Sequence, residues 1–242
     1  METIVKVFEN VDHLSAYFGE MLKQHIHALP VKRGFTISLS GGSTPRAIFN
    51  YLAKHFNESI AWSNLRLFWG DERCVTPDSQ ESNYRMAVES LISRVAIPKS
   101  NVFRIEGEKN PPEQAKEYQQ KVIQNVAMIN GRPAFDLFML GLGEDGHTAS
   151  IFPNQPDLFV SEKLFEVAIQ PESGQQRITA TPVLINQSRN IVFLVTGESK
   201  AGMVARILKK HEGWEHLPAA HIKSINGNVY WLLDKAAASK LN

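Results

Sequence analysis

Residues 135–153 read FDLFMLGLGEDGHTASIFP, an apolar run that leads directly into a charged loop. Residues 135–140 are almost wholly apolar, which is typical of a parallel strand buried on both faces. The loop that follows combines three glycines with two carboxylates and a histidine, side chains that core packing does not require at this place. We predict a catalytic loop in which His147 and Asp145 are the catalytic residues.

The glycines of this loop also spell G-x-G-x-x-G after a strand, the pattern of a dinucleotide-binding turn. A pyrophosphate needs bare amides at the start of a long helix. Here Glu144 and Asp145 would repel the ligand, and Pro153 limits any helix that begins at His147. These features disfavour a dinucleotide. The other alternative is a histidine that only caps or packs, and the glycines and Asp145 favour a functional histidine instead.

Composition restricts the class of protein and its partners. A chain of 242 residues with 43% hydrophobic content can bury a full core, so we expect a single domain over residues 1–242. Lys and Arg total 26 against 25 Asp and Glu, which gives no reason to expect a nucleic acid or an anionic membrane as partner. Cys74 is the single cysteine, which excludes an internal disulfide, fits a reducing compartment and predicts a bystander thiol.

The amino-terminal residues, METIVKVFEN, are too few and too charged for a secretory segment. No run in the sequence approaches the roughly 20 apolar residues that span a bilayer. We therefore expect a cytoplasmic protein with no membrane partner.

A second candidate site is the turn SGGSTP, residues 40–45, which follows a predicted strand over 34–40. We predict a helix with Ser43 or Thr44 as its N-cap and Pro45 at the first helical position. Amides at such a glycine-lined helix start form an anion cradle that suits phosphate. Arg46 in the first turn is unfavourable by roughly 0.3 to 1 kcal/mol unless an anion is nearby. The predicted phosphate contacts are Gly41, Gly42, Ser43 and Thr44.

Two alternatives to a phosphate site exist at this turn. The stretch lacks the G-K-[ST] ending of a nucleotide-binding loop, so we do not expect an ATP site. An ordinary strand-to-helix turn is the plainer alternative, and the sequence leaves it open.

Other predicted strands also end in charged residues. The strand over 65–70 is followed by Asp71, Glu72 and Arg73, and ligands in open parallel sheets bind outside such ends. Residues 82–85 either line this site or cap the next helix. The strand over 190–196 leads into a helix over 197–208 with Lys200 in its first turn, which suggests a second contact to the same anion or a solvated lysine. Arg177 is a further candidate cation at the same rim.

The rest of the chain alternates predicted strands, over 3–8, 102–105, 165–169, 177–181 and 229–233, with predicted helices, over 11–29 and 111–128. His25 and His27 point to different sides of the first helix, so we expect two surface residues and no shared metal site. The pattern predicts a single-domain, doubly wound α/β fold with a mostly parallel sheet and helices on both faces, Rossmann-like in architecture.

Five motifs resemble the 6-phosphogluconolactonase family in matching order along nearly the whole chain: SLSGGSTPRAIF, FWGDERCV with ESNYRMA, LGLGEDGHTASIFP, RITATP and VTGESKA. The resemblance implies hydrolysis of 6-phospho-D-glucono-1,5-lactone to 6-phospho-D-gluconate in the oxidative pentose phosphate pathway, without metal or cofactor. It further implies that the SGGST turn and Lys200 hold the phosphate, that Arg73 helps bind the anion, and that His147 is the base. The expected partner is thus a small sugar-phosphate lactone, and we expect a monomer.

Two rival functions share parts of this pattern. The glucosamine-6-phosphate deaminase family is similar in its glycine-rich turn and D-G-H loop. That family carries an M-D-E-Y type stretch where this chain has GDER, residues 70–73, and a glutamate where this chain has Phe152. A non-enzymatic sugar-phosphate sensing domain would keep the phosphate turn but would have no need for Asp145 and His147.

The hypothesis for the mechanism assigns one residue to both proton transfers. Neutral His147 deprotonates a water, the water attacks the lactone carbonyl, and the imidazolium returns the proton to the departing ring oxygen. An ordinary histidine pKa of about 6.5 leaves a neutral fraction near pH 7. Asp145 either orients the imidazole or stabilises its cation. Asp71 is expected to bind sugar hydroxyls.

Overall fold

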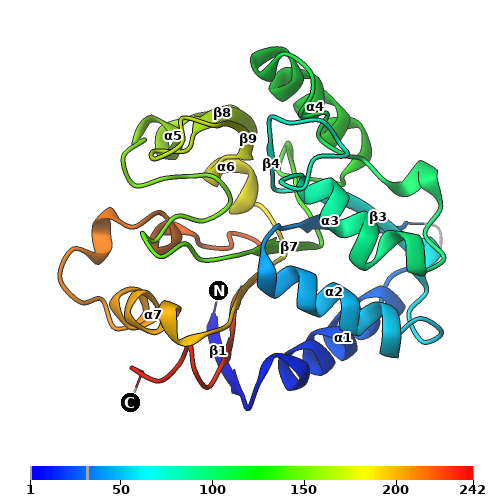
Figure 1. Cartoon of the computed structure of the whole chain (residues 1–242). Coiled ribbons are helices and arrows are strands. Elements are labelled where there is room, and N and C mark those ends of the chain that lie inside the picture. The colour runs from blue at the N-terminus through cyan, green and yellow to red at the C-terminus, as the bar shows by residue number, and fades with distance from the viewer. Residues whose placement is uncertain (1, 31–32, 242) are drawn as a thin grey trace.

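A six-stranded parallel sheet forms the centre of the computed structural model, which describes residues 2–30 and 33–241 (Figure 1). Its strand order is β1-β11-β10-β7-β2-β3, and every neighbouring pair runs parallel. The strands are β1 (Thr3–Phe8), β2 (Phe35–Leu39), β3 (Leu65–Trp69), β7 (Leu137–Leu140), β10 (Asn190–Val195) and β11 (Asn228–Asp234).

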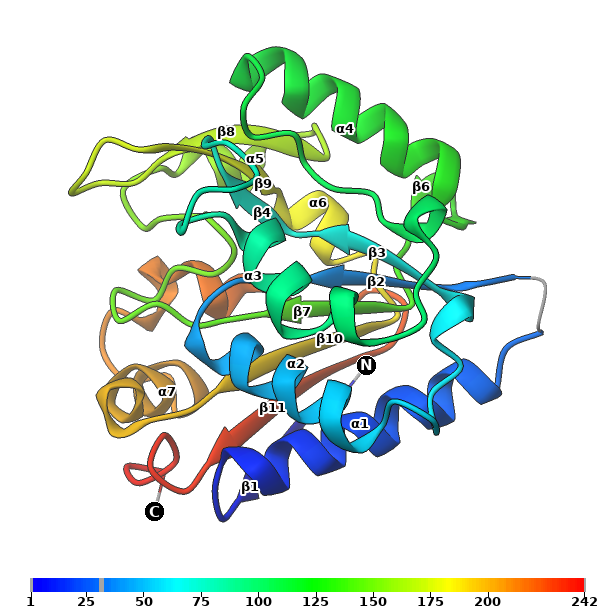
Figure 2. The same cartoon turned by 45° about the vertical axis from the view of Figure 1, so that its right-hand side comes forward.

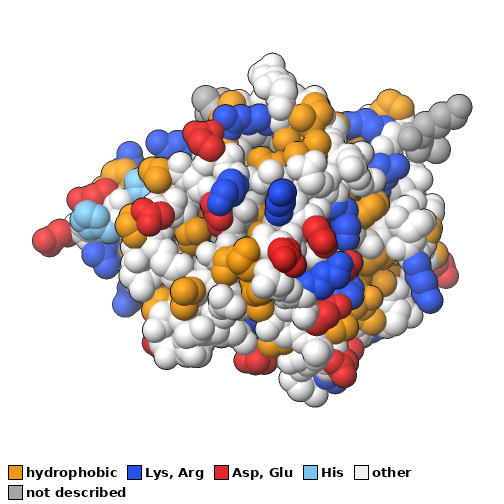
Figure 3. Space-filling model, turned by 90° about the horizontal axis from the view of Figure 1, so that it is seen from above, with side chains coloured by type: hydrophobic (Ala, Val, Ile, Leu, Met, Phe, Trp, Pro, Cys, Tyr) orange, Lys and Arg blue, Asp and Glu red, His pale blue; other side chains and the backbone are white. Residues whose placement is uncertain are grey.

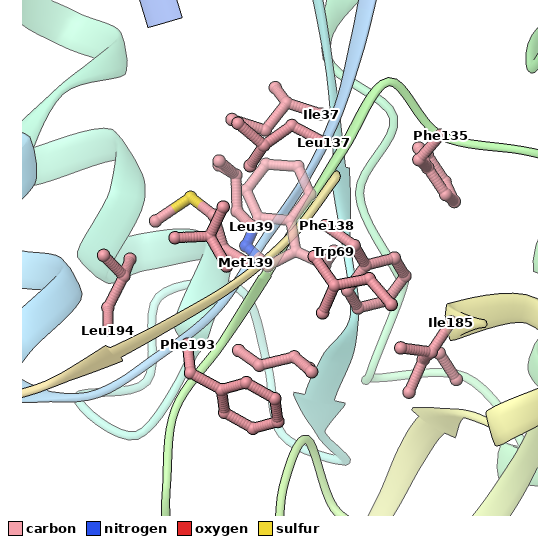
Figure 4. Close-up of a cluster of buried hydrophobic side chains, with 14 of the residues drawn as sticks. Ile37, Leu39, Trp69, Phe135, Leu137, Phe138, Met139, Ile185, Phe193 and Leu194 are labelled. Carbon is pink, nitrogen blue, oxygen red and sulfur yellow. The ribbon is translucent and has the colours of Figure 1, made fainter. Parts of the chain in front are cut away.

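The central strands are apolar because the sheet is covered on both sides. All residues of β2 and β7 are buried, whereas β1 at the edge leaves Val5 and Val7 exposed. Figure 4 shows side chains of β2, β3, β7 and β10 packed into one core, with Trp69 and Phe138 among the labelled residues. Burial on both faces therefore explains the continuous apolar run that precedes the loop after β7.

The longer helices are α1 (Val11–His27), α2 (Ser43–His55), α3 (Asn83–Ser90), α4 (Pro111–Asn125) and α7 (Ala201–Leu208), with short helices α5 (Asp157–Val160) and α6 (Pro182–Ile185). The Asn10 side chain caps α1 by accepting from the amides of Asp12 and His13, and Leu14, Phe18 and Leu22 are buried on its apolar face. α1 packs along α2 on one side of the sheet (Figure 2). The predicted doubly wound, Rossmann-like α/β fold is confirmed.

A second, antiparallel sheet was not predicted. It consists of β4 (Asp71–Arg73), β9 (Gln176–Ala180) and β8 (Phe165–Ile169), in that order, and α4 packs against β8 and β9. The pairing joins Arg73 to Arg177 and Asp71 to Thr179 across two strands that lie far apart in the sequence. The charged residues after β3 are therefore part of a strand and not of a free loop. A third sheet is the hairpin of β5 (Met128–Ile129) and β6 (Arg132–Pro133).

The predicted strand over 102–105 is wrong. Val102 forms one isolated bridge with Leu67, and the Phe103 amide donates to the Leu67 carbonyl at 2.8 Å. The Phe103 carbonyl instead accepts from the buried Tyr118 hydroxyl at 2.8 Å, and that same hydroxyl oxygen accepts from the Trp69 amide at 2.9 Å. The tyrosine thus takes hydrogen-bonding groups that a longer ladder would use.

The expectation of two surface histidines on α1 is half correct. His27 is exposed, but His25 is partly buried and its ring lies 6.4 Å from that of Phe35. Burial lowers the pKa of His25, and the nearby Asp136 charge and a hydrogen bond with Asn190 only partly oppose this. His25 is therefore a packing residue at the end of α1.

Charged side chains are spread over the surface without separation by sign on the face seen from above in Figure 3, where blue and red side chains alternate. This agrees with the formal net charge of +1. Within residues 2–30 and 33–241, no helix is both long and apolar enough to cross a membrane.

Candidate active site

A cavity of about 250 Å³ lies where β10, β7, β2 and β3, four neighbours in the sheet, end. Because these strands are parallel, their carboxyl ends meet at one edge, as expected for a ligand site in an open α/β sheet. Most of the predicted site residues line this cavity: Gly41, Gly42, Ser43, Thr44, Asp71, Arg73, His147, Arg177 and Lys200.

The turn between β2 and α2 differs from the prediction by one or two positions. The N-cap is Gly42, with φ at 106°, a conformation that residues with a Cβ rarely adopt. Ser43 and Thr44 therefore lie in the first turn, and Pro45 is the third helical residue. No side chain caps the first amides of α2, so they are open to an anion in the cavity.

His147 and Asp145 form a hydrogen-bonded pair in the loop after β7. The His147 ring Nδ1 lies 2.6 Å from Asp145 Oδ1, and the His147 amide donates to the same oxygen at 3.0 Å. Gly143 makes this contact possible, because a Cβ there would lie only 2.1 Å from Nδ1 and 2.5 Å from Oδ1. The loop is closed by the Gly143 amide, which donates to the His147 carbonyl at 2.8 Å.

The charge state of Asp145 fixes the useful tautomer of His147. Partial burial raises the pKa of Asp145, but the hydrogen bonds from His147 outweigh it and hold this pKa below its usual value. The carboxylate therefore accepts the proton on Nδ1, which leaves Nε2 as the basic nitrogen. The ring also packs against Phe152, with centroids 4.8 Å apart.

Residues of β4 build the opposite wall through a buried network. Asp71 is 5% exposed and its Oδ2 accepts from the Ser150 hydroxyl at 2.7 Å, which links β4 to the segment that follows His147. Glu72 points away from the cavity and accepts from the amides of Asn83 and Tyr84 at 2.7 and 2.8 Å, at the start of α3. This carboxyl holds α3 in place and presents Asn83 to the cavity.

Two arginines face the cavity side by side, because Arg73 and Arg177 are paired across β4 and β9. Burial lowers the pKa of Arg177, and the positive charge of Arg73 lowers it further. The Arg177 guanidinium also lies over the Phe152 ring, 5.7 Å from its centroid. A bound anion would relieve the repulsion between these two cations.

The end of β10 supplies Lys200, which lies at the end of a 3₁₀ turn (Glu198–Lys200) and forms the N-cap of α7. The predicted single helix over 197–208 is therefore a 3₁₀ turn followed by an α-helix. Thr196 precedes this turn, and its Oγ1 lies 2.6 Å from Thr44 Oγ1. This hydroxyl pair connects the two strand-to-helix junctions that present cavity residues.

Two of the predicted site residues lie outside the cavity lining. Asp145 lies behind His147 and contacts its ring. Arg46 lines an adjoining hollow that also includes Arg73, and its Nη1 lies 4.0 Å from Glu89 Oε2. The side chain of Arg46 thus points away from the main cavity, although it stays in the first turn of α2.

Sequence reasoning missed Thr196 and Glu144 as cavity residues and left Asn83 undecided. Thr196 could have been found because it follows the buried strand β10 directly, and Gly41 and Asp71 lie just two residues beyond the ends of β2 and β3. Asn83 lines the cavity while its neighbour Ser82 caps α3, so both readings of that segment hold. Across the described ranges, 2–30 and 33–241, no three His, Cys, Asp or Glu side chains are grouped to hold a metal ion.

The fold and the cavity define a class: an open α/β protein whose strand ends combine helix-start amides, three cationic side chains and a histidine–aspartate pair. The sequence model described as glucosamine-6-phosphate isomerases/6-phosphogluconolactonase matches residues 9–231. The chain belongs to this family.

Relatives in this family carry lactonase names. A protein of Haemophilus influenzae named 6-phosphogluconolactonase is 45% identical over 206 residues, which is 85% of this chain and 87% of the relative. A crystal structure named devB protein superposes with a TM-score of 0.94 at 38% identity and covers both chains completely. The 6-phosphogluconolactonase of Trypanosoma brucei superposes with a TM-score of 0.87 at 32% identity, over 100% of this chain and 99% of the other.

Proposed function

We propose that this chain is an enzyme that hydrolyses 6-phospho-D-glucono-1,5-lactone to 6-phospho-D-gluconate, a step of the oxidative pentose phosphate pathway. The observation that carries the proposal is that His147, whose ring is held by Asp145, lines the same cavity as the uncapped first residues of α2. The cavity of about 250 Å³ suits a phosphorylated monosaccharide. The family and the names of its relatives support the same reaction.

In this mechanism the phosphate is held by the first amides of α2, with Lys200 and the arginine pair balancing its charge. His147 Nε2 removes a proton from water, and the hydroxide oxygen bonds to the lactone carbon. The bond from that carbon to the ring oxygen then breaks, and the imidazolium gives its proton to the ring oxygen. Asp145 keeps the imidazole in the required tautomer and stabilises its cation.

In the proposed reaction Asp71 accepts hydrogen bonds from sugar hydroxyls. Its Oδ2 is already held by Ser150, so the carboxylate is fixed on the cavity wall. Fixed carboxylates orient a sugar ring, which brings the lactone carbon to His147.

Phe152 argues against the deaminase alternative. It is 1% exposed and packs between the His147 ring and the Arg177 guanidinium. An acid is thus absent at the position where the sequence comparison expects a deaminase glutamate. The proposal further includes a cytoplasmic, monomeric enzyme that needs no metal or cofactor.

A progress curve with freshly prepared phosphorylated lactone tests the function. We expect acid release well above the spontaneous rate, which is measured without protein in the same buffer. Equal rates with and without protein would favour the sensing domain. Release of ammonia from glucosamine-6-phosphate would instead identify a deaminase.

A further inference from the structure

One carboxylate in the cavity lining places a negative charge beside a cation of the same lining. Glu144 lies on the catalytic loop, three residues before His147, and its side chain is 68% exposed. Its Oε1 lies 3.7 Å from Lys200 Nζ, and the Lys200 side chain is 24% exposed. Glu144 therefore partly neutralises a cation that the proposed function assigns to phosphate.

Glu144 differs from the other carboxylate of the lining. Asp71 is buried and hydrogen-bonded to Ser150, so it is fixed in the wall. The exposed Glu144 side chain stands at the rim, where it repels any anion that binds Lys200. A cavity selected only for tight binding of phosphate would not place a carboxylate here, because like charges lower the affinity.

The proposed reaction changes the charge of its own ligand. Hydrolysis forms one bond from the lactone carbon to the water oxygen, breaks the bond to the ring oxygen, and yields a hydroxyl and a carboxylic acid. The acid loses its proton to the solvent at neutral pH, because carboxyl pKa values lie near 4. The product therefore carries one more negative charge than the lactone, and this charge arises at the carbon next to His147.

We propose that Glu144 distinguishes the lactone from its ring-opened acid and weakens binding of the product by charge repulsion. The proposal rests on the function proposed above. Glu144 and His147 line one cavity and lie three residues apart on one loop, so a carboxylate formed beside His147 shares that cavity with Glu144. Glu144 repels the phosphate of substrate and product equally. Only the product also carries a carboxylate, so only the product experiences this second repulsion.

Calorimetric titration of two ligands separates these contributions. 6-Phosphogluconate carries a carboxylate, whereas glucitol 6-phosphate carries the same phosphate and an uncharged hydroxymethyl group in its place. We expect Glu144→Gln to bind both ligands more tightly, since Lys200 is released. The gain should be about two- to fivefold larger for 6-phosphogluconate, the size of one partly exposed charge interaction. High salt should remove the difference by screening.

Glu198→Gln is the matched control. Glu198 is an exposed carboxylate two residues from Lys200 that does not line the cavity. The substitution removes the same net charge from the protein, but at a place outside the cavity. Neither ligand should therefore gain affinity by the same margin as in Glu144→Gln. Thermal unfolding of both variants excludes a folding defect.

Equal gains for both ligands, or no gain for either, would overturn the role of Glu144. The titrations need no turnover, so their result is independent of the lactonase assay. An absence of lactone hydrolysis together with a preserved ligand difference would reject the proposed function and keep the charge discrimination. In an active enzyme, product inhibition should become stronger in Glu144→Gln relative to the KM for the lactone.

Discussion

At the scale of single residues, the site depends on how closely three loop residues approach one another. Gly143 leaves space for the His147 ring to meet the Asp145 carboxylate, because a Cβ would collide with both side chains. The His147 ring also packs against Phe152. The histidine is therefore held in one orientation before any substrate arrives, which is the condition for efficient proton transfer.

Replacement of His147 by Gln tests the proton transfer. The variant keeps a polar side chain but has no titrating nitrogen, so kcat should fall roughly 10²- to 10⁴-fold. KM should change little if the base acts only in the transition state. Steady-state kinetics with the lactone measure both constants, and a near-normal kcat in a folded variant would contradict the assignment.

The pH profile of the same two proteins provides the control. In the wild type, any acid limb of kcat/KM is measured after the spontaneous hydrolysis is subtracted. The second ionisation of a phosphate ester, near 6, produces a similar limb. Only the histidine limb should vanish from the residual activity of His147→Gln.

Cys74 should react slowly with alkylating reagents. Burial raises the pKa of its thiol to about 11, and the charge of Glu72 contributes. The thiolate fraction at pH 8 is then roughly a hundredfold below that of an ordinary cysteine, and so is the expected alkylation rate. Intact-mass measurements with iodoacetamide check this, with a short cysteine peptide as reference. Rapid labelling with loss of activity would contradict the bystander role.

At the scale of elements, α3 depends on a carboxyl from a neighbouring strand. Glu72 of β4 accepts from the amides of Arg73, Asn83 and Tyr84 and from the Ser82 hydroxyl. Three of these donors belong to the start of α3, where helix amides have no intrahelical partners. The cavity residue Asn83 is therefore positioned by a side chain that does not itself face the cavity.

Glu72→Gln should lower the free energy of unfolding. The amide nitrogen of glutamine cannot accept a hydrogen bond, so at least one buried donor loses its partner, at a cost of roughly 1 to 3 kcal/mol. Denaturant titration measures the loss. Glu81→Gln, which changes an exposed carboxylate in the same region, should have little effect and serves as the control.

Glu72→Gln should also change how the free energy of unfolding depends on pH. Burial raises the pKa of Glu72, Asp71 raises it further, and the hydrogen bonds from backbone amides only partly oppose this. Between the unfolded-state and the folded-state pKa the folded state therefore binds more protons, so the stabilisation from this group is present below the unfolded-state pKa and is lost as pH rises through the folded-state pKa. Glu72→Gln should lack that contribution, and an identical pH dependence in both proteins would contradict the shift.

The elements that sequence reasoning predicted correctly are those whose burial forces an apolar run, such as β2, β7 and β10. It missed β4 because the strand consists of Asp71, Glu72 and Arg73, which carry no hydrophobic signal. That strand exists through its pairing with β9, a contact about a hundred residues away along the chain. The parallel sheet made it possible to predict that the site residues meet at one edge. The direction of the Arg46 side chain, which points away from the main cavity, depends on its position around α2 and was not predicted.

At the scale of the whole molecule, the proposed activity is supplied by side chains and backbone amides from four strand ends. Exhaustive treatment with EDTA should therefore leave kcat/KM unchanged, because the described residues offer no cluster suited to a metal ion. The rate is measured before and after dialysis against metal-free buffer. A loss of activity that added zinc or magnesium restores would contradict this prediction.

The sheet order pairs two strands that lie far apart in the sequence. β1 is an edge strand whose neighbour in the sheet is β11, and Thr3 pairs with Val229. During synthesis on the ribosome β1 must therefore wait for its partner until residues 228–234 have been translated. Until then β10, which also borders β11, presents an open edge. A nascent chain stalled before residue 228 would expose these unpaired strand edges and would be prone to aggregate, whereas translation of β11 closes both contacts in one late step.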